Sequence, residues 1–295
     1  MSPFKNYPLL DEQKDEIEAI IDATHIQIVG LKQIKEILRR IIGLKFYADK
    51  VTIEDLLLFL TRRSHLEKIE FRTYRIETLY SWRTINPYKF MPILRPNGYY
   101  SHLTALYFHD LLDHEPENIY FNNEQSARPT SGNLEQVRID NAFKNSQRIT
   151  KSKTIYKGKI YWLLNGKQTG NYGVIQLNTP EGFEVPATDF ERTLIDITVR
   201  PAYAGGVEPV LRAYRLAQSK ISIAKLIKTL HTLNYKYPYH QSVGFYIELA
   251  GNYEAKDSQA FLKFQPLNYD FYLDYGMRNP AYSKKWKMYY PKNLL

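Results

Sequence analysis

Apolar residues recur at helical spacing through the start of the chain and predict three helices. The isoleucines of residues 11–23 share one face, and an apolar stripe runs along residues 31–42. A third helix is predicted over residues 52–63, where Thr52 and Asp55 have the spacing of a capping box. All three helices therefore have an apolar face that can enter a common core.

Two β-like runs follow these helices. Residues 66–72 and 76–82 are rich in β-branched and aromatic residues, and residues 72–75 lie at the tip between them. Three helices followed by a hairpin is the element order of a winged helix-turn-helix. We therefore predict such a domain over residues 1–85.

Turn signals between residues 86 and 98 mark the boundary to a second, larger domain over residues 86–295. Its pattern mixes helices and strands, so the fold class predicted for the chain is α+β, a winged helix-turn-helix followed by a larger mixed α/β domain. The predicted helices cover 102–112, 189–199, 207–218, 223–234 and 240–250. The predicted strands cover 119–122, 154–164, 172–177, 261–264 and 271–275.

Composition narrows the class of protein. The 295 residues are 44% hydrophobic and include no cysteine. This is enough apolar material for a core, and it excludes a disulfide framework, a thiolate zinc site and a cysteine nucleophile. No signal peptide and no apolar run of membrane-spanning length is visible, so we expect a cytoplasmic protein without a membrane partner.

The net charge of +9 is unevenly distributed. Residues 128–172 contain nine basic and two acidic residues, and residues 278–295 contain five basic residues and no acid. The first 85 residues are nearly balanced. The C-terminal stretch also interleaves tyrosines and Trp286 with its basic residues, a composition that suits nucleic acid, an acidic protein or a filled core.

A cluster of three acidic residues is the strongest candidate for a catalytic or metal-binding site. Asp189, Glu191 and Asp196 lie close together in the sequence and have the ligand chemistry of a magnesium site. A structural interpretation is favoured, because Thr188 and Glu191 match a capping box and Arg192 can pair with Asp196 on the helix surface. With no nucleotide-loop or nucleophile motif in the sequence, we expect no enzyme activity and no cofactor.

Two longer motifs resemble a known family. The first runs from Gly98 through Tyr-Tyr-Ser-His-Leu-Thr-Ala-Leu to Tyr107 and continues at 119–122, and the second runs from Pro186 through Ala-Thr-Asp-Phe-Glu-Arg-Thr-Leu-Ile to Asp196, followed by Arg200-Pro201. Together they resemble the AbiEi family, the antitoxins and transcriptional regulators of bacterial abortive-infection toxin–antitoxin systems of type IV. The resemblance extends over nearly the whole chain.

The resemblance implies a function and a set of residues. It implies a DNA-binding antitoxin that regulates its own operator and opposes a nucleotidyltransferase toxin encoded by a neighbouring gene. The motif residues expected to contact a partner are Tyr100, Ser101, His102, Thr104, Asp189, Glu191, Arg192, Asp196 and Arg200. The residues expected to contact nucleic acid are Arg62, Arg63, Lys68, Arg72, Tyr74, Arg75, Lys151, Lys153, Lys157 and Lys159.

Two alternatives remain open. The cluster of Asp189, Glu191 and Asp196 favours a metal-dependent nuclease or nucleotide-processing domain. Glu54 and Asp55 at the start of the third helix repel phosphate, which favours an interaction protein whose winged helix no longer binds DNA. Nucleic acid or an acidic protein is a further candidate partner for the basic second domain, beside the interpretation of its charge as a solubilising surface.

Overall fold

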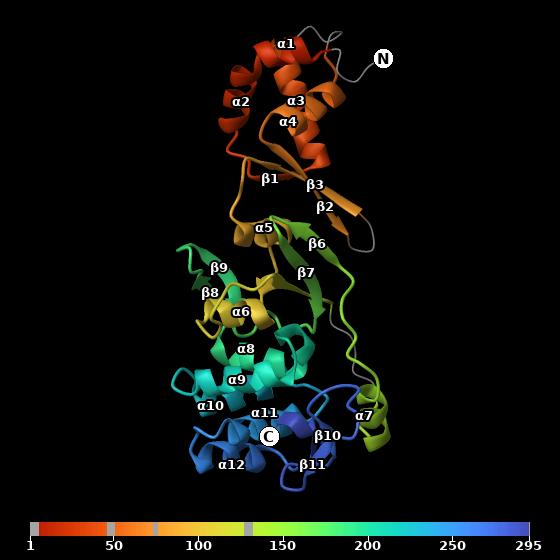
Figure 1. Ribbon diagram of the computed structural model, residues 1–295, viewed down its shortest axis with the longest axis vertical. Coiled ribbons are helices and arrows are strands. Elements are labelled where there is room, and N and C mark those ends of the chain that lie inside the picture. The colour runs from red at the N-terminus through yellow and green to blue at the C-terminus, as the bar shows by residue number, and fades with distance from the viewer. Residues whose placement is uncertain (1–5, 46–50, 73–75, 127–131, 295) are drawn as a thin grey trace. The chain divides into compact units, whose positions relative to one another are not determined.

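The computed structural model describes residues 6–45, 51–72, 76–126 and 132–294 (Figure 1). The chain has a mixed α+β fold, as the sequence predicts, and forms two compact units. The first comprises residues 1–96 together with 152–158, and the second comprises 97–151 and 159–295. The expected boundary after residue 85 differs from this division, because residues 86–96 and the returning segment belong to the first unit.

The first unit packs its helices over a small antiparallel sheet of strand order β1-β3-β2-β6 (Figure 1). Its helices are α1 (Tyr7–Glu12), α2 (Lys14–Asp22), α3 (Leu31–Lys45), α4 (Ile53–Arg63) and α5 (Pro87–Leu94). Its strands are β1 (Ile28–Gly30), β2 (Leu66–Arg72), β3 (Ile76–Trp82) and β6 (Lys153–Tyr156). The predicted hairpin strands have the observed bounds, and the predicted capping box of Thr52 and Asp55 is confirmed.

The core of the first unit is formed by the apolar faces that the periodicity predicts. Ile17, Ile34, Leu38 and Phe59 are completely buried, and Trp82 from β3 closes the cluster. The indole N–H of Trp82 donates a hydrogen bond of 2.7 Å to Asp22 at the end of α2. This unit therefore has a hydrophobic core of its own.

The second unit contains a mixed sheet of strand order β7-β5-β4-β9-β8 and a group of helices. Its strands are β4 (Tyr99–Tyr100), β5 (Asn118–Glu124), β7 (Lys159–Gly166), β8 (Val174–Asn178) and β9 (Glu184–Thr188). Its helices are α6 (His102–Phe108), α7 (Gln136–Phe143), α8 (Phe190–Val199), α9 (Val207–Ala217), α10 (Ile223–Leu233), α11 (Tyr239–Ala250) and α12 (Ala255–Phe264). A small sheet, β10 (Phe271–Tyr272), β12 (Met288–Tyr290) and β11 (Ala281–Ser283), and short 3₁₀ helices at Pro201–Ala204 and Lys292–Leu294 complete it.

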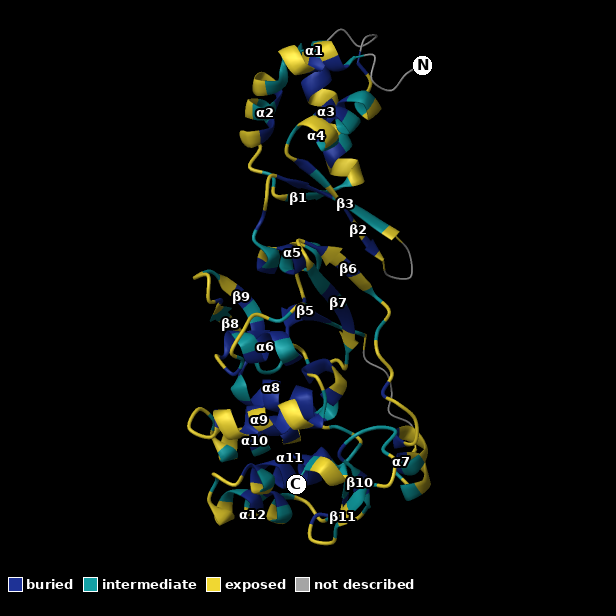
Figure 2. Ribbon diagram, in the orientation of Figure 1, coloured by how far each residue is buried: buried dark blue, intermediate teal, exposed yellow. Residues whose placement is uncertain are grey.

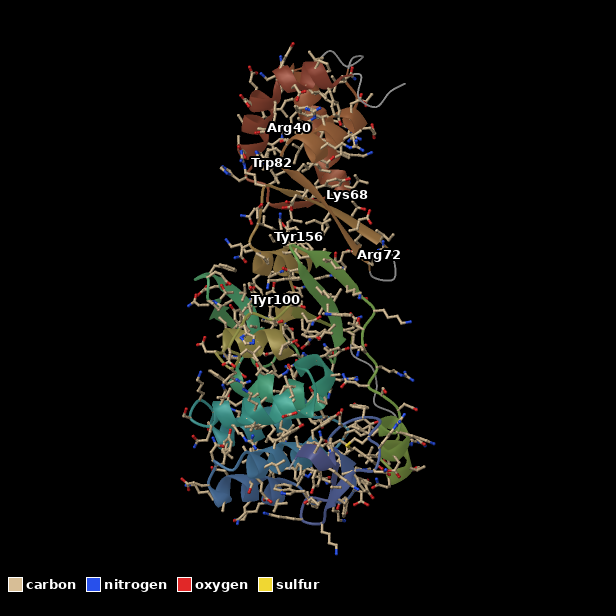
Figure 3. All side chains as sticks on the ribbon, in the orientation of Figure 1. Arg40, Lys68, Arg72, Trp82, Tyr100 and Tyr156 are labelled. Atoms are coloured by element: carbon tan, nitrogen blue, oxygen red, sulfur yellow. The ribbon has the colours of Figure 1, made fainter. Side chains whose placement is uncertain are left out.

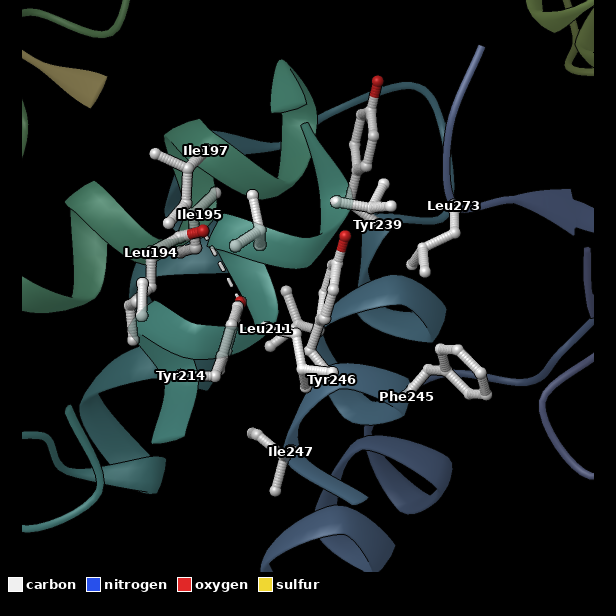
Figure 4. Packing of buried hydrophobic residues seen from close by; sticks show 14 of the residues in the cluster. Leu194, Ile195, Ile197, Leu211, Tyr214, Tyr239, Phe245, Tyr246, Ile247 and Leu273 are labelled. Carbon is white, nitrogen blue, oxygen red and sulfur yellow. Dashed lines mark hydrogen bonds between the residues drawn. The ribbon is translucent and has the colours of Figure 1, made fainter. Parts of the chain in front are cut away.

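Helices α8, α9 and α11 enclose the main core of the second unit (Figures 2 and 4). Within it, the rings of Tyr214 and Tyr246 stack with centroids 5.2 Å apart. The Tyr214 hydroxyl lies 2.8 Å from the Thr198 hydroxyl, so the tyrosine is satisfied inside the apolar cluster. None of the helices in the described part of the chain is both long and apolar enough to cross a membrane.

Three element predictions are wrong, and two helices are missing from the predictions. The predicted strand 261–264 lies inside α12, and the predicted helix 102–112 ends at Phe108. Residues 154–164 form β6 and β7 rather than one strand, because Lys157 and Gly158 turn the chain with φ of 49° and 76°. Helices α5 and α7 were not predicted at all.

Candidate functional site

The two family-like motifs meet at one cavity of the second unit. The first motif contributes the start of α6 and the middle of β5, and the second contributes α8 and the residue that follows it. The cavity has a volume of about 420 Å³, and we call it the arginine cavity. Its lining includes His102, Asn122, Arg148, Lys167, Arg192, Asp196, Arg200, Tyr203 and Tyr235.

A buried ion pair forms the base of the arginine cavity. The Nε of Arg192 lies 2.8 Å from Oδ1 of Asp196, and the two side chains are only 4% and 6% exposed. Arg192 also donates to the Tyr99 hydroxyl at 3.0 Å and to the Tyr172 carbonyl at 2.6 Å. Burial raises the pKa of Asp196, and the guanidinium of Arg192 opposes this shift. The predicted pairing is therefore present, but it lies inside the fold rather than on a helix surface.

Hydrogen bonds continue from this pair to the loop after β7. The Tyr99 hydroxyl donates to Glu124 at 3.0 Å and accepts from Asn122 at 2.6 Å. Glu124 in turn accepts the backbone N–H groups of Thr169 at 2.7 Å and Gly170 at 2.9 Å. Burial acts to raise the pKa of Glu124, but the hydrogen bonds from Thr169 hold this pKa below its usual value. The network fixes the wall of the cavity.

His102 borders the same cavity in an unusual backbone conformation. Its φ is 54°, in the left-handed region that disfavours most side chains, and its side chain is buried beside Tyr203, with ring centroids 5.3 Å apart. Nδ1 of His102 lies 2.8 Å from the Ser101 hydroxyl. Burial lowers the pKa of His102 to about 3, and the charges of Arg192 and Arg200 add to this effect. The imidazole is therefore neutral at physiological pH.

A testable consequence follows from the lowered pKa of His102. Unfolding exposes an imidazole that binds a proton below about pH 6.5, whereas the folded group binds one only near pH 3. We expect the free energy of unfolding to fall as the pH drops below 6.5, with His102 contributing about 1 kcal/mol per pH unit. His102→Asn, which tolerates the left-handed backbone, should reduce that slope in urea titrations at pH 5 and pH 7. His25→Asn, at an exposed position with the same φ, is the control, and equal slopes in wild type and His102→Asn would contradict the assignment.

Three further cations line the arginine cavity without a carboxylate partner. None of the ion pairs among the described residues includes Arg148, Lys167 or Arg200. Lys167 donates to the Leu233 carbonyl at 2.7 Å and lies 5.2 Å from the centroid of the Tyr235 ring. Because Asp196 is the sole acid among the described residues of the lining and pairs with Arg192, these residues carry an excess of positive charge.

The three carboxylates of the second motif do not meet at one point, because Asp196 is engaged apart from Asp189 and Glu191. Asp189, rather than Thr188, caps α8 by accepting the N–H of Arg192 at 2.8 Å. The predicted capping box of Thr188 and Glu191 is therefore wrong, and the Thr188 hydroxyl lies 2.7 Å from that of Thr193.

Lys225 neutralises two of these acids. Its Nζ lies 2.9 Å from Asp189 and 2.6 Å from Glu191, and Glu191 also accepts the N–H of Ser222 at 3.0 Å. Asp196 is engaged separately by Arg192. Across the described ranges, no three histidine or carboxylate side chains are grouped so that they could hold a metal ion.

Other residues of the first motif serve packing. Tyr100 is fully buried and meets Phe108 and Phe121 edge to face. The Thr104 hydroxyl accepts the N–H of Tyr120 at 2.8 Å, which ties α6 to β5. Both residues therefore hold Ser101 and His102 in place rather than presenting a surface.

The structure divides the predicted nucleic-acid residues between the units. Lys68 and Arg72 lie on the exposed face of β2 (Figure 3), and Lys153 of β6 is paired directly opposite Arg72. We call Lys68, Arg72 and Lys153 the basic strand face. Lys157 follows β6 and pairs with Glu67 at 2.5 Å.

The remaining predicted residues lie elsewhere. Arg62 and Arg63 are exposed at the end of α4, where Arg63 stands 5.8 Å from the Tyr7 ring. Lys151 and Lys159 belong to the second unit, and Lys159 pairs with Glu115 at 2.8 Å. Tyr74 and Arg75 lie outside the described residues.

The aromatic residues of the C-terminal stretch differ in burial: Tyr289 and Tyr290 are half-buried, and Tyr282 is 40% exposed. Trp286 and Met288 are fully buried, and Tyr289 stacks on Tyr272 with centroids 4.9 Å apart. Of the alternatives left open by the sequence, core filling therefore applies to Trp286.

Sequence reasoning missed Arg148, Lys167, Tyr203 and Tyr235 as site residues. The basic run at 128–172 was the only signal for Arg148, and no pattern placed it beside α8. Thr150 explains its position, because its N–H donates to the Tyr203 hydroxyl at 3.0 Å and its hydroxyl donates to the Leu163 carbonyl at 3.0 Å.

Comparisons with known proteins support the fold of the chain but identify no family for it. No protein-family model matches the chain, and no curated protein matches it. Among solved structures, the chain is similar to the crystal structure of the RV2827C protein from Mycobacterium tuberculosis, with a TM-score of 0.60 and 11% sequence identity. The likeness covers 92% of this chain and 89% of that one. At this identity it supports the fold alone.

Proposed function

We propose that the protein is a DNA-binding antitoxin and transcriptional regulator of the AbiEi type, acting in the cytoplasm. The arrangement of the first unit carries the proposal. Helices α2, α3 and α4 pack on a hairpin, and β1, which lies between α2 and α3, pairs with β3. This arrangement supports a winged helix-turn-helix, with α4 as the recognition helix and the β2–β3 hairpin as the wing.

The charges of this unit favour the strands over the start of α4 as the main DNA contact. Glu54 pairs with Lys35 at 2.9 Å, and this hydrogen bond lowers the pKa of Glu54, so the acid remains charged at the helix start. Phosphate is repelled there. The basic strand face instead offers Arg72 on the wing strand and Lys153 on its neighbour for phosphate contacts. Lys68 lies on the same face, where Glu70 pairs with it at 2.8 Å.

The second unit is proposed to contact the toxin. The two family-like motifs support this assignment, and the partner they imply is a nucleotidyltransferase encoded by a neighbouring gene. Because the acids of the second motif are engaged by Lys225 and Arg192, no observation favours the nuclease alternative.

The proposal is tested with the purified full chain and the DNA upstream of its own gene. Fluorescence anisotropy should show binding that is tighter than to a scrambled duplex of equal length and that weakens as salt rises. Affinity capture should retain the product of the adjacent gene. Loss of both interactions would overturn the proposal, and capture of the partner with no salt-dependent DNA binding would favour the interaction protein with a degenerate winged helix.

A further inference from the structure

The arginine cavity has a rigid base and a rim of cations that have no carboxylate partner among the described residues, although Lys167 donates to the Leu233 and Asn234 carbonyls. Its base is the Arg192–Asp196 pair, which hydrogen bonds connect through Tyr99 to Asn122 and Glu124. These groups satisfy one another. The rim residues Arg148, Lys167 and Arg200 reach the same space from three separate segments of the chain.

Bringing these three cations together costs electrostatic free energy, and no acidic side chain among the described residues of the lining offsets this cost. Like charges around one cavity repel, and protein surfaces ordinarily intersperse acids among them. Here the nearest acid in the lining is already engaged by Arg192. An anion bound between the three side chains would remove the repulsion, so the free cavity is preorganised for a negatively charged group.

The neutral wall of the cavity indicates which anion fits. Asn122 and His102 line it alongside the cations, and both are hydrogen-bonding groups without charge. His102 also holds a left-handed backbone, a strain of the kind that occurs at ligand sites. Two guanidinium forks, one ammonium and neutral side chains match a tetrahedral anion of charge two or more better than a single carboxylate.

The size of the cavity and its aromatic residues indicate a ligand that is larger than a single anion. A cavity of about 420 Å³ falls within the range of about 300–1,000 Å³ that small-molecule sites occupy. Tyr203 and Tyr235 supply aromatic surface next to the cations. The space is larger than one phosphate group needs, and an organic ring can occupy the rest.

We propose that the arginine cavity binds a diphosphate group, free or as part of a nucleotide, whose oxygens are held by Arg148, Lys167 and Arg200. The site lies entirely within the second unit and is separate from the proposed DNA contact. The phosphate group is the recognised feature, whether it belongs to a nucleotide or to free diphosphate.

Isothermal titration calorimetry of the full chain tests this with four probes: ADP, inorganic pyrophosphate, adenosine and a single-stranded octanucleotide. Saturable binding of ADP or pyrophosphate, with none of adenosine, is expected. Binding of ADP alone identifies a nucleotide, and equal binding of both identifies the diphosphate as the whole ligand. No heat from either at millimolar concentration, or binding of the octanucleotide alone, would overturn the proposal.

Variants connect the binding to the cavity. Arg200→Gln and the exposed Arg148→Gln should each weaken ADP or pyrophosphate binding about tenfold or more, because each removes a charged hydrogen bond. Arg278→Gln, an exposed arginine of the same unit outside the cavity, should bind as wild type does. Thermal unfolding measured in parallel confirms that each variant is folded. Equal affinity in all three variants would place the ligand elsewhere and contradict the assignment.

Discussion

Replacing Arg192 with leucine is expected to lower the free energy of unfolding of the second unit by about 3–5 kcal/mol at pH 7. The substitution leaves Asp196 as an unpaired carboxylate with 6% of its side chain exposed. It also removes the donors that serve the Tyr99 hydroxyl and the Tyr172 carbonyl. Urea unfolding monitored by tyrosine and tryptophan fluorescence measures the loss.

Two controls separate burial from the ion pair itself. The double variant Arg192→Leu/Asp196→Leu removes both charges and should be more stable than Arg192→Leu alone, because no unpaired charge remains. Arg212 pairs with Asp113 in the same unit, but their side chains are 62% and 63% exposed. Arg212→Leu should therefore cost no more than about 1 kcal/mol. Similar losses for Arg192→Leu and Arg212→Leu would show that the Arg192 pair is not buried in solution.

The second large effect is expected at Trp286. Trp286→Ala should destabilise the second unit by about 3–5 kcal/mol, because it empties a fully buried site in the core. The fit is close: a β-carbon added at Gly244 would touch the indole ring and approach Cβ of Phe261 to 2.9 Å. Differential scanning calorimetry or urea unfolding reports the change.

Matched variants test whether Trp286 acts by filling space. Its indole N–H has no hydrogen-bond partner among the described residues, so Trp286→Phe should lose less stability than Trp286→Ala. Tyr282, which is 40% exposed in the same segment, should tolerate alanine at a cost of about 1 kcal/mol. Wild-type stability of Trp286→Ala, accompanied by weaker nucleic-acid binding, would restore the surface interpretation of this segment.

Elements with a strong amphipathic pattern were predictable from sequence, and elements that depend on caps or context were not. The sequence pattern does not predict helix α5, because Asn86-Pro87 is also typical of a turn. The Asn86 side chain accepts the N–H of Tyr88, and Pro87 occupies the first helical position, so the same dipeptide starts a helix. Likewise, Phe261 and Phe264 lie three residues apart on α12, whose start is capped by Glu254 and Asp257. A short run with two phenylalanines is also typical of a strand, and the cap at Glu254 and Asp257 is the sequence feature that distinguishes the helix.

The candidate site was partly predictable for a similar reason. The motifs supplied Ser101, His102, Arg192, Asp196 and Arg200, and four of these line the arginine cavity. Their separation in sequence is bridged by the pairing of β4 with β5 and β9, which no local pattern reveals. Arg148 and Tyr235 come from connecting segments, and only long-range packing places them at the same cavity.

The salt dependence of DNA binding tests the central claim most directly, since each lost phosphate contact lowers the slope of log affinity against log salt by about 0.9. The variant Lys68→Gln/Arg72→Gln/Lys153→Gln should bind upstream DNA more weakly, with a slope smaller by about 2–3 than that of wild type. The matched variant Arg148→Gln/Lys167→Gln/Arg200→Gln should keep the wild-type slope. An unchanged slope in the first variant, or a loss confined to the second, would contradict DNA binding through the basic strand face.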